Sequence, residues 1–234
     1  MADAGLAWEQ LTPQVFRCRL AFCDVTVGLV AGGGQALLID TGTTLAEAEA
    51  VAADVRSLTG HEVGHVVLTH NHFDHILGSS VFAGARFYCA TAVLATMATA
   101  GPGLRAEAVR YGADAAEVDR AVAALAPPRD AVGEATLRLG ALDVAISHPG
   151  RGHTDHDLIV AVAGAGPTVV FCGDLVEESG DPCFDEQSDP AQWPSTLRRV
   201  IEIGGESALY VPGHGAVVDA DFVRRQAMWL AGRS

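Results

Sequence analysis

One short segment of the sequence, THNHFDH at residues 69–75, concentrates side chains that bind metal ions. Neutral imidazole offers a nitrogen lone pair near physiological pH, and aspartate adds an anionic oxygen. In an extended chain His70 and His72 point the same way, because they are two residues apart. Asp74 and His75 follow directly. A single metal ion would leave some of these donors redundant, whereas a pair of ions would use them all.

Three further potential donors occur far downstream, each after an apolar stretch that we expect to be a β-strand. They are His153 in GHT, Asp174 in FCGD and His214 in VPGHG. Glycine lies beside each of them and allows the backbone to approach a site closely. We therefore expect strands to hold these donors and short loops to present them at a common site.

The elements that position these donors are predicted from hydrophobic patterning and turn residues. We expect strands at residues 25–30, 36–39, 65–68, 86–89, 136–139, 142–147, 157–162, 168–171 and 209–211. We expect helices from Thr43 or Thr44 to about residue 58, at 193–203 and at 219–230. An alanine-rich helical excursion is expected at about 91–126, broken at Gly101-Pro102-Gly103. This order favours a single α+β domain over residues 1–234, a four-layer αβ/βα sandwich.

The segments THNHFDH, GHT, GD and PGHG resemble those of metallo-β-lactamase-fold hydrolases and occur in the order of that family. The resemblance extends from IDTG at residues 39–42 to His214 and covers most of the chain. It implies two metal sites joined by a bridging aspartate. The implied ligands are His70, His72 and His153 for the first site, Asp74, His75 and His214 for the second, and Asp174 as the bridge. Asp40 is expected either to support the site from behind or to cap its own turn.

The chemistry implied by this resemblance is hydrolysis. Two divalent ions about 3.5–4 Å apart can share a hydroxide and lower the pKa of the water from which it forms. That hydroxide would attack a carbonyl or phosphoryl centre, and Asp74 would orient it as the catalytic carboxylate. Zinc is the metal expected for this histidine-rich set, with iron and manganese as alternatives.

The bridging aspartate resembles the glyoxalase II and lactonase branch, because true β-lactamases usually carry cysteine or serine at this position. We therefore expect a small ester, thioester or lactone as the substrate. Basic residues suited to holding glutathione are not evident. The alternatives are a mononuclear-iron oxidoreductase resembling persulfide dioxygenases, a metal-dependent phosphodiesterase, β-lactam hydrolysis as a main or side activity, and a non-hydrolytic member such as a cyclase or binding protein.

The pocket is expected to lie under the helical excursion and the loop at residues 177–184. Its aromatic candidates, with core packing as the alternative, are Phe73, Tyr111, Phe184 and Trp193. Two other residues have open roles. Arg151 would either meet a substrate carboxylate or form a surface ion pair, and Cys183 is a candidate reactive thiol.

The composition and charge of the chain indicate which kinds of partner it can bind. A net charge of −14 disfavours nucleic acid and leaves a small molecule as the expected partner. No apolar run approaches the roughly 18 residues of a membrane helix. The N-terminal segment carries Asp3 and Glu9 and lacks the pattern of a signal peptide, so we expect a cytoplasmic protein. The five cysteines have no CxxC spacing and predict no disulfide framework.

Overall fold

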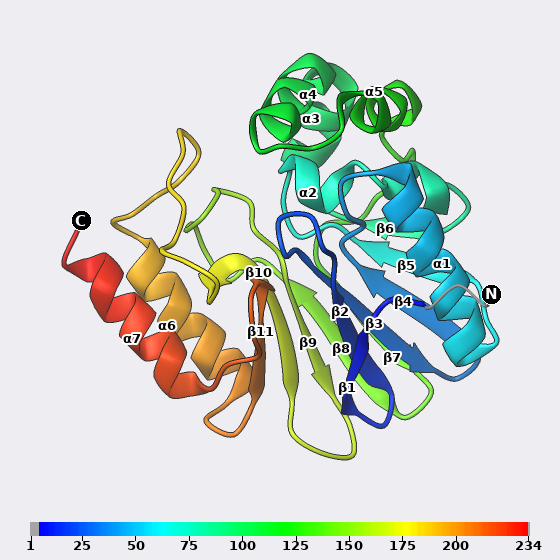
Figure 1. The fold of residues 1–234 in the computed structure, drawn as a ribbon. Coiled ribbons are helices and arrows are strands. Elements are labelled where there is room, and N and C mark those ends of the chain that lie inside the picture. Colours follow the sequence, from blue (N-terminus) through cyan, green and yellow to red (C-terminus); the bar gives the residue numbers. More distant parts are fainter. Residues whose placement is uncertain (1–4, 234) are drawn as a thin grey trace.

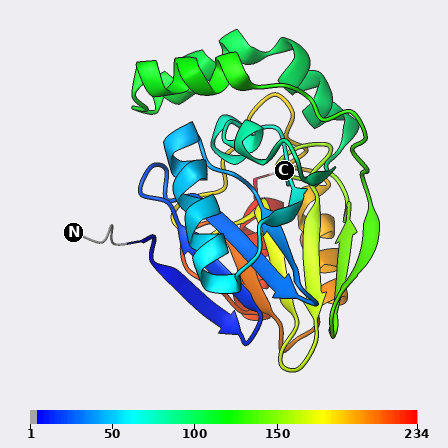
Figure 2. The same ribbon diagram turned by 90° about the vertical axis from the view of Figure 1, so that its right-hand side faces the viewer.

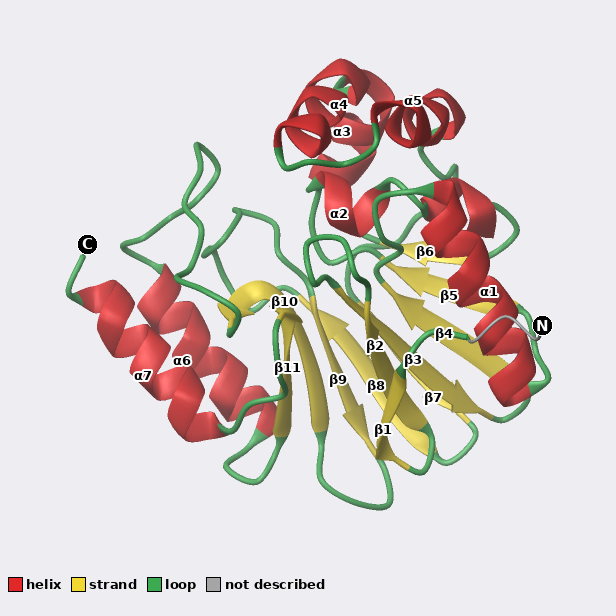
Figure 3. Ribbon diagram, viewed as in Figure 1, coloured by secondary structure: helices red, strands yellow, loops and turns green. Residues whose placement is uncertain are grey.

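Two β-sheets form the centre of the molecule in the computed structural model, which describes residues 5–233 (Figures 1 and 3). The first sheet has the strand order β1-β2-β3-β4-β5-β6. Its strands are β1 (Trp8–Thr12), β2 (Val15–Arg19), β3 (Thr26–Gly32), β4 (Gln35–Ile39), β5 (Val63–Val67) and β6 (Arg86–Tyr88). Pairing is antiparallel from β1 to β4 and parallel from β4 to β6.

The second sheet has the order β11-β10-β9-β8-β7, with only β10 and β11 parallel. Its strands are β7 (Ala135–Leu139), β8 (Leu142–Ser147), β9 (Ile159–Ala163), β10 (Val169–Glu177) and β11 (Leu209–His214). Strand β10 was expected to end at Phe171. It continues to Glu177 because its register against β11 shifts on either side of Gly173. This irregularity places Asp174 inside a strand rather than in a loop.

Helices cover the outer face of each sheet and complete the four layers (Figure 1). Helix α1 (Leu45–Thr59) packs outside the first sheet, and α6 (Trp193–Gly204) and α7 (Ala220–Ala231) pack outside the second. Three apolar clusters fill the spaces between the layers, and the middle cluster joins the inner faces of both sheets. The expected α+β sandwich is confirmed. Among the described residues, every helix is too short or too polar to span a bilayer.

The helical excursion lies as a separate group above the first sheet (Figure 2). It contains α3 (Thr91–Thr99), α4 (Gly101–Arg110) and α5 (Ala115–Ala124), and it follows the one-turn helix α2 (Phe73–Ile76) and the 3₁₀ turn η1 (Ser79–Phe82). The expected break at residues 101–103 is misplaced. Helix α3 ends before it, and Pro102 stands in the first turn of α4, where its missing N–H costs no helical hydrogen bond. A second break, unforeseen, falls between α4 and the N-cap Asp114.

The N-terminal hairpin β1–β2 was not predicted from the sequence. Part of the segment expected to lack a signal peptide, including Asp3, lies outside the described residues. The hairpin turns at Pro13 and Gln14 and forms the edge of the first sheet. Its buried Arg17 donates a hydrogen bond of 2.7 Å to the Gly215 carbonyl. The hairpin therefore supports the end of β11.

Helix α1 begins with a reciprocal capping box. The Thr44 hydroxyl accepts from the Glu47 N–H at 3.1 Å, and the Glu47 carboxylate accepts from the Thr44 N–H at 3.0 Å. We expect Thr44→Ala to lower the free energy of unfolding by about 1 kcal/mol, because it leaves a helix N–H without its partner. Urea denaturation measures the change. Thr91→Ala is the matched control, since Thr91 begins α3 without a side-chain cap. Equal midpoints for the two variants would contradict a stabilising cap.

Candidate metal centre

The segment at residues 69–75 begins where β5 ends and continues into α2. His70 lies in a bend after β5, His72 is the extended N-cap residue of α2, and Asp74 and His75 lie in the single turn of that helix. The segment is anchored to both sheets, because the Leu68 N–H donates to Tyr88 and the Thr69 carbonyl accepts from Leu158. The expected extended geometry therefore holds for His72, whereas the chain bends at His70 and Asn71, and a helical turn carries Asp74 and His75.

The structure brings together all seven donors expected from the sequence. They form two groups, each with donor atoms within 4.8 Å of one another. The first group is His70, His72, His153 and Asp174, and the second is Asp74, His75 and His214. His153 comes from the β8–β9 connection, Asp174 from β10 and His214 from the end of β11. Strands that are far apart in sequence thus converge on one point, at the end facing α2 (Figure 1).

Asp174 lies between the two groups. Its Oδ2 is 3.7 Å from His70 Nε2 and 3.5 Å from His153 Nε2. Its Oδ1 is 3.2 Å from His75 Nε2, and Oδ2 is also 3.4 Å from His214 Nε2. One carboxylate therefore reaches nitrogens of both groups, which is the geometry that a bridging ligand requires.

Asp40 fixes the orientation of two histidines from behind. Its Oδ2 accepts from His75 Nδ1 at 2.9 Å and from the Thr69 hydroxyl at 2.8 Å, and its Oδ1 accepts from the Thr69 N–H. The Thr69 oxygen in turn lies 3.0 Å from His70 Nδ1 and accepts its proton. Both histidines therefore turn Nε2 toward the centre. Of the two roles considered for Asp40, these contacts favour support of the site over capping of its own turn.

The other three histidines are also held by the nitrogen that faces away from the centre. His72 Nε2 donates to Asp185 Oδ2 at 2.9 Å. His153 Nδ1 donates to the Cys183 carbonyl at 3.3 Å, and His214 Nδ1 donates to the Cys23 carbonyl at 2.8 Å. Sequence reasoning missed Asp185, because it lies in a loop with no motif and meets His72 only through the fold.

Buried polar atoms at the centre lack hydrogen-bond partners among the described residues. These atoms are His70 Nε2, His75 Nε2 and Asp174 Oδ1. An unpartnered buried polar atom is costly, and native proteins nearly always satisfy it. Nitrogen and carboxylate donors that point at one another across a few ångströms are satisfied by a cation between them. The residues present therefore fit divalent metal ions.

Electrostatics at the centre also favour cations. Burial lowers the pKa of His214, but Asp174 and Asp74 outweigh burial and raise this pKa to about 10. Burial raises the pKa of Asp174, but His75, His214 and His70 hold it well below its usual value. These carboxylates thus favour positive charge at the histidines, carried either by protons or by metal ions. Since metal ions compete with these protons, we expect metal affinity to fall as the pH falls.

Glu177 is a second residue that sequence reasoning missed. It ends β10, is buried, and offers an oxygen within 4.8 Å of donor atoms of Asp174 and His214. Its Oε1 accepts from the Ser179 N–H at 3.2 Å and from the Ser179 hydroxyl at 2.8 Å. Burial and the nearby Asp174 raise the pKa of Glu177 to about 7. The only sequence signal was its position three residues after the bridging aspartate.

A cavity of about 260 Å³ opens above the donors. It is lined by Cys23, His72, Phe73, Asp74, Glu107, Tyr111, His153, Asp174, Glu177, Ser179, Cys183 and His214. Phe73 and Tyr111 thus line it, whereas Phe184 packs against Trp193 with ring centroids 5.6 Å apart. Arg151 is half exposed and lies 3.5 Å from Asp189, as a surface ion pair would. Burial raises the pKa of Cys183, which disfavours a reactive thiolate.

The fold and these motifs define a class of protein. The sequence matches the metallo-beta-lactamase superfamily over residues 20–214, and the chain belongs to this superfamily. Hydroxyacylglutathione hydrolase from Acidiphilium cryptum (strain JF-5) is 30% identical over 201 residues, or 84% of this chain and 67% of that protein. The family resemblance drawn from the motifs is confirmed.

Solved metallo-β-lactamases share the fold. DIM-1, in a crystal exposed to ceftazidime, has a TM-score of 0.72 at 19% identity and covers 98% of both chains. The metallo-β-lactamase from Pontibacter korlensis has a TM-score of 0.70 at 19% identity, covering 97% of this chain and 99% of its own. At such low identity the likeness extends to the architecture alone.

The contact between His72 and Asp185 yields a prediction about metal affinity. We expect Asp185→Ala to weaken zinc binding at the first donor group by about 10–100-fold, because His72 loses the partner that fixes its orientation. Competition with a chromophoric chelator measures the two affinities. Asp181→Ala, an exposed aspartate of the same loop, is the matched control. Equal affinities in both variants and the parent would refute this role for Asp185.

Proposed function

We propose that this protein is a dinuclear metal-dependent hydrolase of small esters, thioesters or lactones. The observation that carries the proposal is the pair of donor groups that share Asp174. A single-ion enzyme would not need both groups. In this proposal the first ion is held by His70, His72 and His153, the second by Asp74, His75 and His214, and both by Asp174. The nitrogen-rich donor set favours zinc, with iron and manganese as the alternatives.

Bound there, two divalent ions would supply an activated water and polarise the carbonyl oxygen of the substrate. The chain's own residues position the reactants. Asp74 lines the cavity, with Oδ2 3.4 Å from His214 Nε2, and can accept a hydrogen bond from the attacking water. Phe73 and Tyr111, with ring centroids 5.6 Å apart, present an apolar wall that excludes bulk water from the acyl group.

Two observations support an acyl substrate of small size. The cavity of about 260 Å³ suits a small molecule, and the net charge of −14 opposes a nucleic-acid partner. A relative at 30% identity is named as a hydrolase of hydroxyacylglutathione. The aspartate at position 174 also departs from the cysteine or serine that true β-lactamases usually carry, which places β-lactams behind esters, thioesters and lactones as candidates.

Metal content provides the first test. We expect elemental mass spectrometry of protein purified without added metal to find about two zinc ions per chain, because each donor group offers ligands for one ion. A chelator should remove both ions together with esterase activity, and added zinc should restore them. About one iron per chain, with oxygen uptake on a persulfide, would instead support the mononuclear dioxygenase. Cleavage of an activated phosphodiester as the main activity would support a phosphodiesterase.

The role of Asp74 provides a second test. We expect Asp74→Ala to lose the second ion and to lower kcat/KM by about two orders of magnitude or more, since it removes both a metal donor and a partner for the attacking water. Metal stoichiometry and ester hydrolysis are measured in the same preparation. Asp221→Ala on the exposed face of α7 is the control. A variant that keeps both ions and the full rate would remove Asp74 from the site.

A further inference from the structure

The cavity above the metal donors has an acidic lining. Apart from the proposed ligands, its acidic side chains are Glu107 and Glu177, and no arginine lines it in the described part of the chain. The chain contains no lysine at all, so its fifteen basic side chains are all arginines. The pocket therefore lacks the fixed cation that an anionic substrate would need for pairing.

Glu177 is built into the wall of the cavity. Its backbone N–H donates to the buried Gln226 of α7 at 3.0 Å, and Gln226 Nε2 donates back to the Leu175 carbonyl at 2.8 Å. The N–H and the hydroxyl of Ser179 both donate hydrogen bonds to Glu177 Oε1. No described residue donates a hydrogen bond to Oε2. A carboxylate held in this way presents one oxygen to whatever enters the cavity, at little further entropic cost.

Two other lining residues, Glu107 and Tyr111, contact a cation that does not itself line the cavity. The Arg110 guanidinium lies 5.3 Å from the Tyr111 ring centroid, and its Nη2 is 3.2 Å from Glu107 Oε1. An aromatic face beside a carboxylate is a typical cation-binding arrangement. Arg110 is 70% exposed, so this pair is weak and solvent competes for it. A substrate cation can therefore take its place on Tyr111 and Glu107.

The position of Glu107 supports the same inference. Glu107 lines the cavity but belongs to neither donor group, so bound metal ions would not take up its carboxylate. No arginine among the described residues lines the cavity beside it. A cationic group of a substrate would therefore meet a carboxylate there and no fixed positive side chain.

We propose that the pocket selects acyl substrates with a cationic group, such as a substituted ammonium, which lies between Glu177 and the Tyr111–Glu107 wall. This inference rests on the proposed hydrolase function and names the substrate class of the same site. The reaction itself is ordinary hydrolysis. Water supplies the new oxygen of the acid, the C–O or C–S bond breaks, and the leaving alcohol or thiol takes a proton from that water.

A pair of thioesters isolates the effect of charge. Acetylthiocholine and S-(3,3-dimethylbutyl) thioacetate have the same shape, but only the former carries a quaternary ammonium, whose charge does not change with pH. We expect the zinc-loaded protein to hydrolyse the cationic member with about 10-fold higher kcat/KM. This preference should shrink as salt is added. The anionic 3-(acetylthio)propionate should be the slowest of the three.

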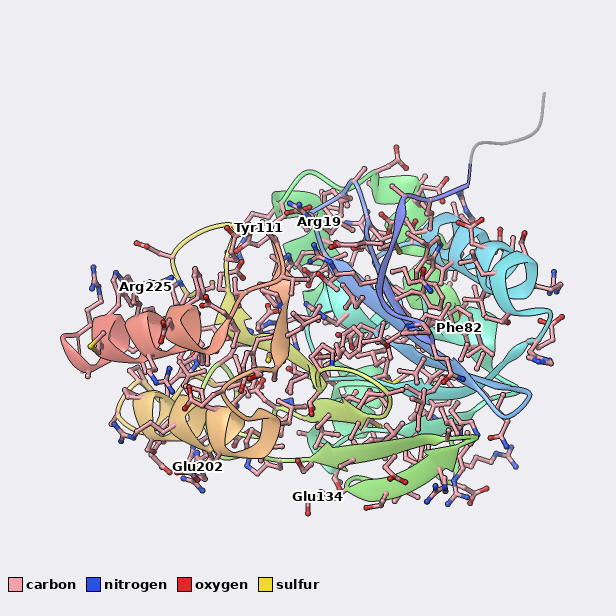
Figure 4. All side chains as sticks on the ribbon, turned by 90° about the horizontal axis from the view of Figure 1, so that it is seen from below. Arg19, Phe82, Tyr111, Glu134, Glu202 and Arg225 are labelled. Atoms are coloured by element: carbon pink, nitrogen blue, oxygen red, sulfur yellow. The ribbon has the colours of Figure 1, made fainter. Side chains whose placement is uncertain are left out.

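Variants assign the preference to particular residues. Glu177→Gln removes the charge but keeps an acceptor for Ser179, and Glu107→Gln removes the charge beside Tyr111. We expect each to lower the ratio of cationic to neutral kcat/KM by about 3-fold or more. Glu202→Gln on α6, well away from Tyr111 in Figure 4, should leave the ratio unchanged.

The outcomes separate this inference from the hydrolase proposal. Equal kcat/KM values for the isosteric pair would overturn the inference and leave the hydrolase in place. A preference for the anionic thioester would also overturn the inference and would favour Arg110 as the partner of a substrate carboxylate. If no thioester, ester or lactone is hydrolysed, the hydrolase proposal fails. In that case, calorimetry compares the binding of choline with that of its neutral isostere 3,3-dimethylbutan-1-ol and tests the cation-selective pocket by itself. Tighter binding of choline to the zinc-loaded protein supports a cation-selective pocket, and equal or weaker binding overturns it.

Discussion

The buried carboxylate of Asp174 is the group around which the rest of the site is built. It lies within 3.7 Å of imidazole nitrogens from both donor groups, and the glycines of two motifs make room for it. A Cβ at Gly213 would stand 1.8 Å from Asp174 Oδ1, so only glycine fits there. Gly173 has a φ of 52°, which lets β10 shift its register and aim the carboxylate inward. The glycines of the GD and PGHG segments are therefore both needed to accommodate the Asp174 carboxylate.

A second set of contacts keeps the histidines facing that carboxylate. Asp40 has a φ of 60°, a left-handed conformation that is costly for a residue other than glycine. Its hydrogen bonds to Thr69 and His75 offset this strain, because they require the carboxylate to point back across β5. The strained backbone at Asp40, directly after β4, thus lets this carboxylate fix the orientation of the histidine donors.

A structural feature could be predicted from the sequence when neighbouring residues in the chain determine it. The seven donors were predictable, because four lie in the single motif THNHFDH and three lie beside glycine in short motifs after apolar stretches, and so were the layers of the sandwich. The hairpin β1–β2 was not, since the burial of β1 does not alternate regularly and β2 is held between two neighbouring strands that are not evident from its local pattern. Asp185 and Glu177 were not predictable either. Asp185 meets His72 across 113 residues, a contact that no local pattern encodes.

The metal donors and some of the other residues of the cavity come from different parts of the fold, so these can vary independently. Most of the donors lie within a strand, at a strand end or in the segment anchored to both sheets, where a shift of position would disturb the core. The cavity-lining residues Glu107 and Tyr111 come instead from α4 and its C-terminal end, in an excursion packed outside the sandwich. Substitutions there can change the charge and shape of the cavity while the donors stay in place. In the proposed hydrolase, the excursion can therefore vary the shape and charge of the cavity without moving the donors, while Glu177 stays fixed on β10.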